Sequence, residues 1–441
     1  MDSLTASTSN LNPADIAWML GACALVLLMT PALAFFYGGL VRSKNVLNTM
    51  MMSFASLGVV GLVWAIVGYS LSFATGNPWI GGLSFFALSG VGVEANGTIP
   101  HVLFMAYQGT FAIITAALIS GAVVERMRFK TYLLFITLWS LFVYAPVCHW
   151  VWAADGWLLK LGALDFAGGT VVHINAGVAA LVTSLVIGPR KDFGKQAFLP
   201  HNVPFVLLGA GLLWFGWFGF NAGSALGANT KAAVAFVNTF LAPIATLATW
   251  MLLDVRRIGK VTAVGAATSI VVGLVAITPA AGFISPMSAI ALGAIAAFPS
   301  YFAILWRART RLDDSLDVVA AHGLGGVVGA LLTGVLASAP WGGTDGLLHG
   351  NPGQLWLQIV AVLATLAYSG AMTFGLLKLI GVFLPLRVKE RQEGVGMDVN
   401  AHDEEGYTTG EGALLLLTSL EPTRSSGTAR SAVTGIVGGE A

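Results

Sequence analysis

Two histidines stand inside long apolar segments of the sequence, where an imidazole is costly unless it has a partner or a function. His173 lies in "DFAGGTVVHINAG" and His322 in "LDVVAAHGLGG", and each is followed four residues later by a Gly-Val pair. A single histidine of this kind is often only a hydrogen-bonding group between helices. Because the pattern is repeated, we expect a functional pair. Two neutral imidazoles can share a hydrogen bond and line a path for a small polar molecule or a proton.

The elements that position these histidines are predicted membrane spans. Of the 441 residues, 56% are hydrophobic and only 10% are charged, whereas soluble domains are about 25% charged. A span needs about 20 apolar residues, and the sequence predicts an all-α polytopic membrane protein with eleven transmembrane helices. Residues 1–385 are then the membrane domain, and 386–441 form a cytoplasmic tail. The expected spans are 14–38, 45–73, 101–124, 131–153, 167–188, 202–223, 231–253, 261–279, 282–305, 318–338 and 356–385.

Lysine and arginine fall mainly in alternate loops between these spans. One set of loops carries clusters such as 126–130 and 307–311, and the tail is also basic, whereas the opposite loops hold only Lys160 and Lys231. Cytoplasmic loops are enriched in Lys and Arg. We therefore expect the N-terminus outside and the C-terminus inside the cell.

The repeated histidine pattern predicts two inverted five-helix repeats followed by a long eleventh helix. Inverted repeats are typical of transporters and place the site where the halves meet. His173 lies eight residues from Asp165 at the outer end of span five, and His322 lies eight residues from Asp314 at the inner end of span ten. At 1.5 Å per residue, each ring is about 12 Å deep. In a core about 30 Å thick, the rings then lie within about 6 Å of each other along the membrane normal.

Aromatic side chains gather toward the outer ends of several predicted spans. Phe111 belongs to "YQGTF", Trp152 belongs to "CHWVWAADG", and Phe220 and Ser224 lie one turn apart in "WFGFNAGSA". Most such aromatics form a girdle at the membrane interface, but rings and a hydroxyl together can also hold a small cation. Asp165 either stabilises a helix N-terminus or provides a fixed negative charge beneath such a site.

Other classes of function find little support in the sequence. A metal centre needs three or four ligands, and no cysteine, glutamate or third histidine shares the depth of the pair, so no metal or other cofactor is expected. No G-x-x-x-x-G-K-[ST] loop indicates ATP use, and no nucleophile beside either histidine favours an enzyme. The net charge of +1, without a basic patch, gives no sign of nucleic-acid binding.

Four segments, "DFAGGTVVHINAG", "YGGLVRSKN", "WFGFNAGSA" and "LDVVAAHGLGG", together resemble the ammonium transporter family, which includes the methylammonium permeases and the Rhesus proteins. The similarity is to the bacterial and plant branch and extends from the first span to about Asn400. The resemblance implies a homotrimer with one pore per subunit. It also implies a substrate-binding site at Phe111, Trp152 and Ser224, a gate at Phe111 and Phe220, a pore pair at His173 and His322, and an acid beneath the outer site at Asp165.

Three parts of the sequence extend or depart from this resemblance. Tyr107 occupies a position where close relatives often carry Phe, and a hydroxyl there would make the outer vestibule wetter. The tail segment "EGVGMDVNAHDEEGY" resembles the part that meets a PII-type nitrogen-signalling protein in bacterial relatives. Residues after about 411 match no family element and are expected to be disordered.

The expected function is that of a non-enzymatic ammonium transporter in the cytoplasmic membrane. It recruits NH4+ at the outer site, deprotonates it and conducts NH3, with or without the proton, past the histidine pair. Three alternatives stay open: a passive NH3 or CO2 channel of the Rhesus type, an ammonium sensor that signals through the tail, and a membrane metalloenzyme built on the histidines.

Overall fold

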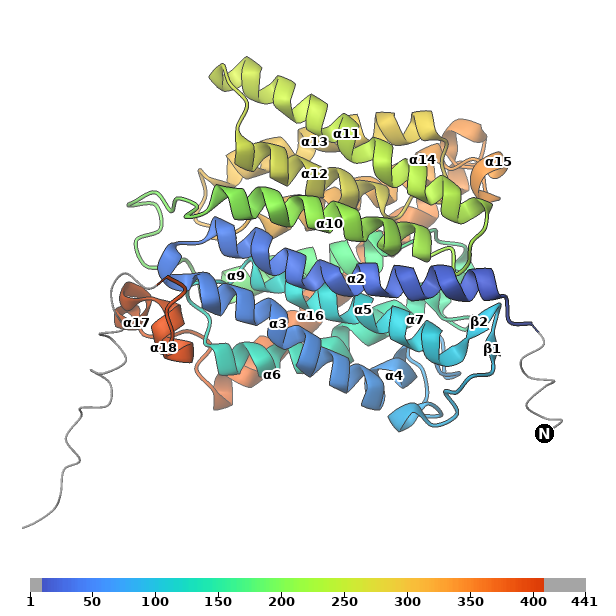
Figure 1. The fold of residues 1–441 in the computed structure, drawn as a ribbon, viewed down its shortest axis with the longest axis horizontal. Coiled ribbons are helices and arrows are strands. Elements are labelled where there is room, and N and C mark those ends of the chain that lie inside the picture. Colours follow the sequence, from blue (N-terminus) through green and yellow to red (C-terminus); the bar gives the residue numbers. More distant parts are fainter. Residues whose placement is uncertain (1–9, 408–441) are drawn as a thin grey trace, which may run out of the picture. The chain divides into compact units, whose positions relative to one another are not determined.

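The computed structural model describes residues 10–407. Residues 1–9 and 408–441, which include the part of the tail predicted to be disordered, lie outside the described residues. Most of the described chain is helical, as the sequence predicts, and it includes a short antiparallel pair of strands (Figure 1). The α-helices and strands are α2 (Pro13–Leu40), α3 (Val46–Val63), α4 (Tyr69–Phe73), β1 (Ala95–Asn96), β2 (Ile99–Pro100), α5 (His101–Ser120), α6 (Phe129–Trp139), α7 (Ala145–Trp152), α8 (Trp157–Leu161), α9 (Asn175–Ile187), α10 (Val203–Gly223), α11 (Thr230–Ile258), α12 (Ala263–Ile277), α13 (Pro286–Arg307), α14 (Gly325–Leu336), α15 (Ala339–Gly342), α16 (Pro352–Phe383), α17 (Glu390–Val395) and α18 (Met397–His402).

Within residues 10–407, ten helical stretches are long and apolar enough to cross a bilayer. They coincide with ten of the eleven predicted spans. The remaining one, 261–279, contains α12, which has 15 residues and is therefore only about 22 Å long. Its C-terminal half and the turn that follows are buried, and non-helical backbone is tolerated at membrane depth where protein surrounds it. The count of eleven spans and the orientation of the termini stay predictions.

The first helix of each predicted half begins in a similar way. Asn12 accepts hydrogen bonds from two backbone N–H groups at the start of α2, and Asn202 accepts one at the start of α10. An asparagine cap satisfies backbone donors that the helix itself leaves unpaired. Each helix also has a proline in its first turn, Pro13 or Pro204, where no helical hydrogen bond is lost. Local sequence thus fixes where both helices begin.

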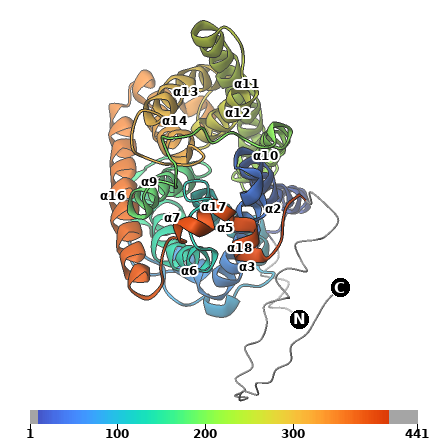
Figure 2. The same cartoon turned by 90° about the vertical axis from the view of Figure 1, so that its left-hand side faces the viewer.

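Helices α2 and α10 lie side by side (Figures 1 and 2). Their close approach depends on glycines of α10. A Cβ at Gly219 would lie 2.6 Å from the Cβ of Leu25, and a Cβ at Gly209 would overlap the backbone of Phe36. The two predicted halves therefore meet along a seam of small residues, as helices in membranes often do.

Loops that the charge pattern assigns to the inner side are joined by a buried ion network. Glu125, which follows α5, accepts hydrogen bonds from Arg42, which follows α2, and from Arg190, which follows α9. Arg190 also donates to both carboxylate oxygens of Asp313, which follows α13, at 2.9 Å. Burial raises the pKa of Glu125, but the two arginines more than offset this effect, so that the pKa lies below its usual value. These loops therefore lie at one end of the helix bundle.

The first part of the tail packs against the same end. The carboxylate of Asp398 accepts hydrogen bonds from the backbone N–H groups of Leu47 and Asn48 at 3.1 and 2.8 Å. A residue of the tail thus caps the N-terminus of α3. Residues 386–406 belong to the same compact unit as the membrane helices, and Figure 1 shows α17 and α18 at the opposite end of the bundle from β1 and β2.

We expect Arg190→Ala to destabilise the protein, because it leaves two buried carboxylates, Glu125 and Asp313, with fewer partners. Breaking a buried ion pair costs about 3–5 kcal/mol, so the Tm of the detergent-solubilised protein, measured by tryptophan fluorescence, should fall by several degrees. Lys195→Ala changes an exposed residue of the same loop and should leave the Tm unchanged. Equal Tm values for the two variants would contradict the structural role of the network.

Candidate functional site

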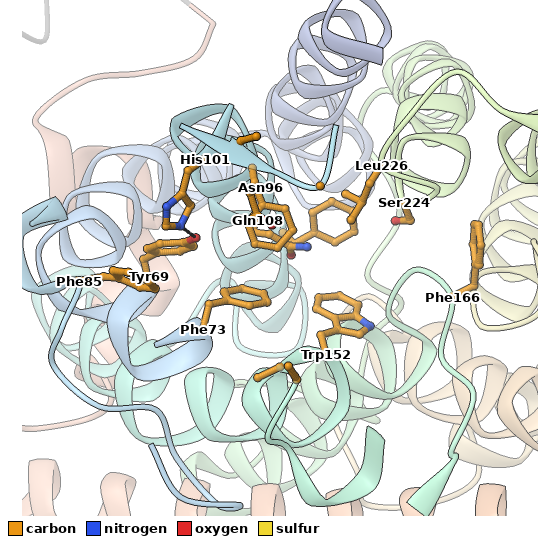
Figure 3. Close-up of a pocket in the computed structure, with 16 residues that line it drawn as sticks. Tyr69, Phe73, Phe85, Asn96, His101, Gln108, Trp152, Phe166, Ser224 and Leu226 are labelled. Atoms are coloured by element: carbon orange, nitrogen blue, oxygen red, sulfur yellow. Dashed lines mark hydrogen bonds between the residues drawn. The ribbon is translucent and has the colours of Figure 1, made fainter. Parts of the chain in front are cut away.

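A cavity of about 600 Å³ lies next to β1. Its wall includes Phe111 of α5, Trp152 of α7 and Ser224 at the end of α10, which are the three residues predicted to bind substrate (Figure 3). We call these three residues the outer site and this space the outer cavity. None of the lining residues within the described chain carries a carboxylate, an ammonium or a guanidinium group. The remaining lining residues include Tyr69, Phe73, Phe85, Asn96, His101, Phe104, Gln108 and Phe166.

Hydrogen bonds to the backbone hold two members of the outer site in place. The indole N–H of Trp152 donates to the carbonyl oxygen of Asp165 at 3.0 Å, and the indole meets Phe111 edge-on, with ring centroids 5.8 Å apart. The hydroxyl of Ser224 donates to the carbonyl oxygen of Phe220 at 2.8 Å, so its own oxygen remains an acceptor. Rings and an acceptor oxygen on one wall can bind a small cation that carries N–H groups.

Tyr107 contributes packing and not water contact. The residue is fully buried, and its hydroxyl donates to the carbonyl oxygen of Gly219 at 2.9 Å and lies 3.3 Å from the Oγ of Ser224. The expectation that this hydroxyl makes the vestibule wetter is therefore wrong, because the hydroxyl turns toward the last turn of α10.

Phe111 and Phe220, the predicted gate, stack on each other. Their ring centroids are 4.2 Å apart, their planes are tilted by 35°, and the two residues are 1% and 0% exposed. Phe111 lines the outer cavity, whereas Phe220 lines a second, smaller cavity. The stacked rings thus stand between the two cavities.

The second cavity contains the two histidines. The Nδ1 atoms of His173 and His322 are 3.3 Å apart, and their ring centroids are 5.3 Å apart. For these nitrogens to share a hydrogen bond, one ring carries its proton on Nδ1 and the other carries it on Nε2. His173 also stacks on Trp217 and Phe220. The imidazoles are therefore in contact, and their role in transport stays a prediction.

The second cavity is small and lined almost wholly by apolar side chains. Its volume is about 10 Å³, close to the least that a single water molecule requires. An ion that enters it finds no replacement for its hydration shell apart from the imidazoles. The other lining residues are Met29, Leu33, Phe36, Ile114, Leu118, Val172, Leu213, Trp217, Phe220 and Val271.

Both histidines are carried by π-helical turns, Gly169–Ile174 before α9 and Val319–Leu324 before α14. Such wide turns are rare and are frequent at functional sites. Hydrophobic periodicity gives no sign of them. The first turn of α9 touches the second π-helical turn at a pair of glycines, because a Cβ at Gly177 would overlap the backbone of Gly323. The lack of a side chain at Gly177 lets α9, which continues from the turn of His173, come close enough to the turn of His322 for the imidazoles to meet.

Asp165 caps the π-helical turn that carries His173. Its carboxylate accepts hydrogen bonds from the four backbone N–H groups of residues 168–171 at 2.7–3.1 Å. This geometry is that of an acid at a helix N-terminus. Because the carbonyl of Asp165 also binds Trp152, the cap fixes one wall of the outer site. A direct role of the carboxylate in cation binding stays a prediction.

The same arrangement recurs in the second half of the chain. Asp314 lies eight residues before His322, and its carboxylate accepts the backbone N–H of Val319 at 2.7 Å, at the start of the second π-helical turn. The repeat that the sequence indicates for the histidines thus extends to the acids that cap their turns.

Several residues of the outer cavity are missing from the sequence-based prediction. The hydroxyl of Tyr69 lies 2.6 Å from the Nε2 of His101, and the Nδ1 of His101 lies 2.9 Å from a carboxylate oxygen of Glu94. Hydrogen bonds from the backbone N–H of Gly92, from its own backbone amide and from His101 lower the pKa of Glu94. Tyr69 and His101 are 32 positions apart, and no spacing rule pairs them. Among residues 10–407, no group of three or more His, Cys, Asp or Glu side chains is placed to hold a metal ion.

The fold and the two cavities define a multi-pass membrane protein of the solute-transporter class. The profile of the Ammonium Transporter Family matches residues 17–407, and the chain belongs to that family. An ammonium transporter of Bacillus subtilis is 48% identical over 399 residues, which cover 89% of this chain and 98% of the relative. One of Aquifex aeolicus is 49% identical over 411 residues, with coverage of 91% and 95%. The structure of Saccharomyces cerevisiae Mep2 superposes with a TM-score of 0.82 at 36% identity and covers 88% of this chain and 90% of that protein.

These comparisons confirm the predicted family and the all-α membrane fold. The relatives are named as transporters, which is a non-enzymatic class. The roles of the individual site residues stay predictions.

We expect Gly177→Ala to push the start of α9 away from the π-helical turn that carries His322, since its Cβ has no room beside Gly323. Overpacking of this kind costs about 1–3 kcal/mol, and a wider separation breaks the contact between the imidazoles. Both the Tm and the rate of ammonium uptake into proteoliposomes should fall.

Gly211→Ala is the matched control for this substitution. A Cβ at Gly211 meets nothing within 4 Å, and alanine favours a helix by about 1 kcal/mol relative to glycine, so stability and uptake should be retained. Normal uptake by Gly177→Ala would show that the close glycine contact is not needed for transport.

Proposed function

We propose that this protein transports ammonium across the cytoplasmic membrane by separating NH4+ into a proton and NH3. NH4+ binds at the outer site, loses its proton near the stacked rings of Phe111 and Phe220, and continues as NH3 past His173 and His322. The observation that carries the proposal is the second cavity, which has a volume of about 10 Å³ and is lined by apolar side chains and the two imidazoles.

Binding at the outer site combines weak attractions that suit a small cation with N–H groups. Phe111 and Trp152 provide ring quadrupoles, each worth about 0.5–2 kcal/mol to a nearby cation. The oxygen of Ser224 accepts one N–H, since its own proton is donated to a backbone carbonyl. Such a site recruits ammonium without holding it so tightly that it cannot leave.

Selectivity arises below the outer site, where the ion would have to lose its water. Moving an isolated charge into an apolar medium costs tens of kcal/mol by simple solvation estimates. NH4+ avoids this cost by releasing a proton and entering as a neutral molecule, whereas K+ has no proton to release. The Nε2 of His173 has no hydrogen-bond partner among the described residues, so it is available to NH3 in transit.

The fate of the released proton decides how much charge accompanies each nitrogen. If the proton returns to the outer solution, the protein behaves as a neutral channel of the Rhesus type. If the proton crosses, the contact between His173 and His322 provides a route, because one Nδ1 can pass a proton to the other. Current and uptake measured together distinguish the two cases.

We further propose that the protein works as a homotrimer and that residues 386–441 form its cytoplasmic tail. The segment from Glu393 to Tyr407 is a candidate contact for a PII-type signalling protein. What supports the proposal for the tail is the anchoring of Asp398 to α3, which presents the segment beside the loops predicted to face the cytoplasm.

We expect His173→Ala and His322→Ala, made separately, to lower ammonium transport and to weaken the exclusion of K+. Each substitution removes a polar partner for NH3 and enlarges the dry cavity, so that water and ions enter more readily. Ammonium-evoked current, ammonium uptake and K+-evoked current in proteoliposomes provide the three readouts.

His349→Ala is the matched control, because His349 is exposed and does not line either cavity. It should behave like the parent protein. Unchanged ammonium current together with unchanged K+ exclusion in both pore variants would contradict the role proposed for His173 and His322.

A further inference from the structure

The outer cavity extends well beyond the outer site. Its volume of about 600 Å³ far exceeds the roughly 10–15 Å³ of cavity that one water molecule requires, and ammonium is similar to water in size. Figure 3 shows Trp152 and Ser224 on one side of the cavity and a second group of rings on the other side. We call this second group the aromatic lobe, and it consists of Tyr69, Phe73 and Phe85, together with Phe104, whose ring packs against that of Phe73.

The rings of the aromatic lobe pack against one another on the cavity wall. The ring centroids of Phe73 and Phe104 are 5.1 Å apart, and those of Tyr69 lie 5.5 Å from Phe73 and 5.6 Å from Phe85. Aromatic rings attract cations within about 6 Å of their centroids. The lobe therefore presents a surface that favours a cation over an anion.

Gln108 lies between the aromatic lobe and the outer site (Figure 3). The residue lines the cavity and is only 8% exposed, yet its amide oxygen has no hydrogen-bond partner among residues 10–407. A buried acceptor without a partner is unfavourable. The oxygen is covered in this structure, and an N–H donor of a cation in the cavity would satisfy it when the amide turns toward the cavity that the residue lines.

A chain of hydrogen bonds connects the carboxylate of Glu94 to the hydroxyl of Tyr69 in the aromatic lobe. The Nδ1 of His101 donates to the carboxylate of Glu94 at 2.9 Å, and its Nε2 accepts the hydrogen bond of the Tyr69 hydroxyl at 2.6 Å. The carboxylate requires the proton on Nδ1, and in a neutral imidazole this leaves Nε2 as the acceptor. Each bond in such a chain polarises the next, so the oxygen and the ring of Tyr69 attract a cation more strongly.

We propose that Gln108 and the aromatic lobe form a second ammonium position, which the ion occupies before it reaches the outer site. The ligand is a small monovalent cation with N–H donors, either ammonium or methylammonium. Glu94 and His101 are positioning residues that act through Tyr69. The inference rests on the proposed function, because the second position adds a step to the same path.

The test records ammonium-evoked current from the full chain in proteoliposomes over a range of ammonium concentrations. Gln108→Leu removes the acceptor and keeps most of the volume. The half-saturating ammonium concentration should rise about five-fold or more, because hydrogen bonds to charged groups are the stronger ones, while the maximal current is retained. Gln108→Glu keeps acceptor oxygens and adds charge, so it should lower that concentration. Gln196→Leu, the same substitution at an exposed loop residue, should change neither quantity.

The double variant Gln108→Leu with Ser224→Ala decides whether the two positions are separate. Separate positions give a shift equal to the product of the two single shifts, whereas a single shared position gives a smaller combined shift. An unchanged half-saturating concentration in Gln108→Leu, or a combined shift well below the product, would overturn the second position. The proposed function is judged on the parent protein, where a lack of ammonium-evoked flux would contradict it whatever the variants show.

Discussion

The structure of the centre of this protein depends on one constraint, which is the free-energy cost of removing water from an ion. The cavity between the stacked phenylalanines and the histidine pair has room for about one water-sized molecule, and its walls replace almost none of the hydrogen bonds that an ion loses. Such a space becomes selective only if it stays narrow and dry. Both properties depend on close packing: the stacked rings of Phe111 and Phe220 close one side, and the contact of Gly177 with Gly323 keeps the segments that carry the two imidazoles close together.

Polar groups outside this centre hold it in shape. The carboxylate of Asp165 accepts hydrogen bonds from four backbone N–H groups at the start of the turn that carries His173. Its backbone carbonyl also accepts the indole N–H of Trp152. The position of the outer site and the position of the first imidazole therefore depend on the same residue. At the other end of the bundle, Glu125, Arg190 and Asp313 tie the connecting loops together, and Asp398 joins the tail to α3.

The sequence predicts the features that follow from periodicity and from counting. Long apolar runs mark the spans, and equal distances from opposite ends place His173 and His322 at one depth. The sequence does not predict the π-helical turns that carry both histidines, because widening a helical turn by one residue does not change the hydropathy pattern. The sequence also misjudges Tyr107, since only the packing of α5 against α10 decides where its hydroxyl points. The array of Glu94, His101 and Tyr69 joins distant segments, which no local pattern could reveal.

In the proposed mechanism, nitrogen crosses the dry cavity as NH3, and selectivity follows from the loss of a proton. The most direct measurement records membrane current and the uptake of isotopically labelled ammonium from the same proteoliposomes, with K+ gradients as the comparison. We expect ammonium uptake with no more than one charge per nitrogen and no current driven by K+. A K+ current comparable to the ammonium current would contradict the proposed mechanism.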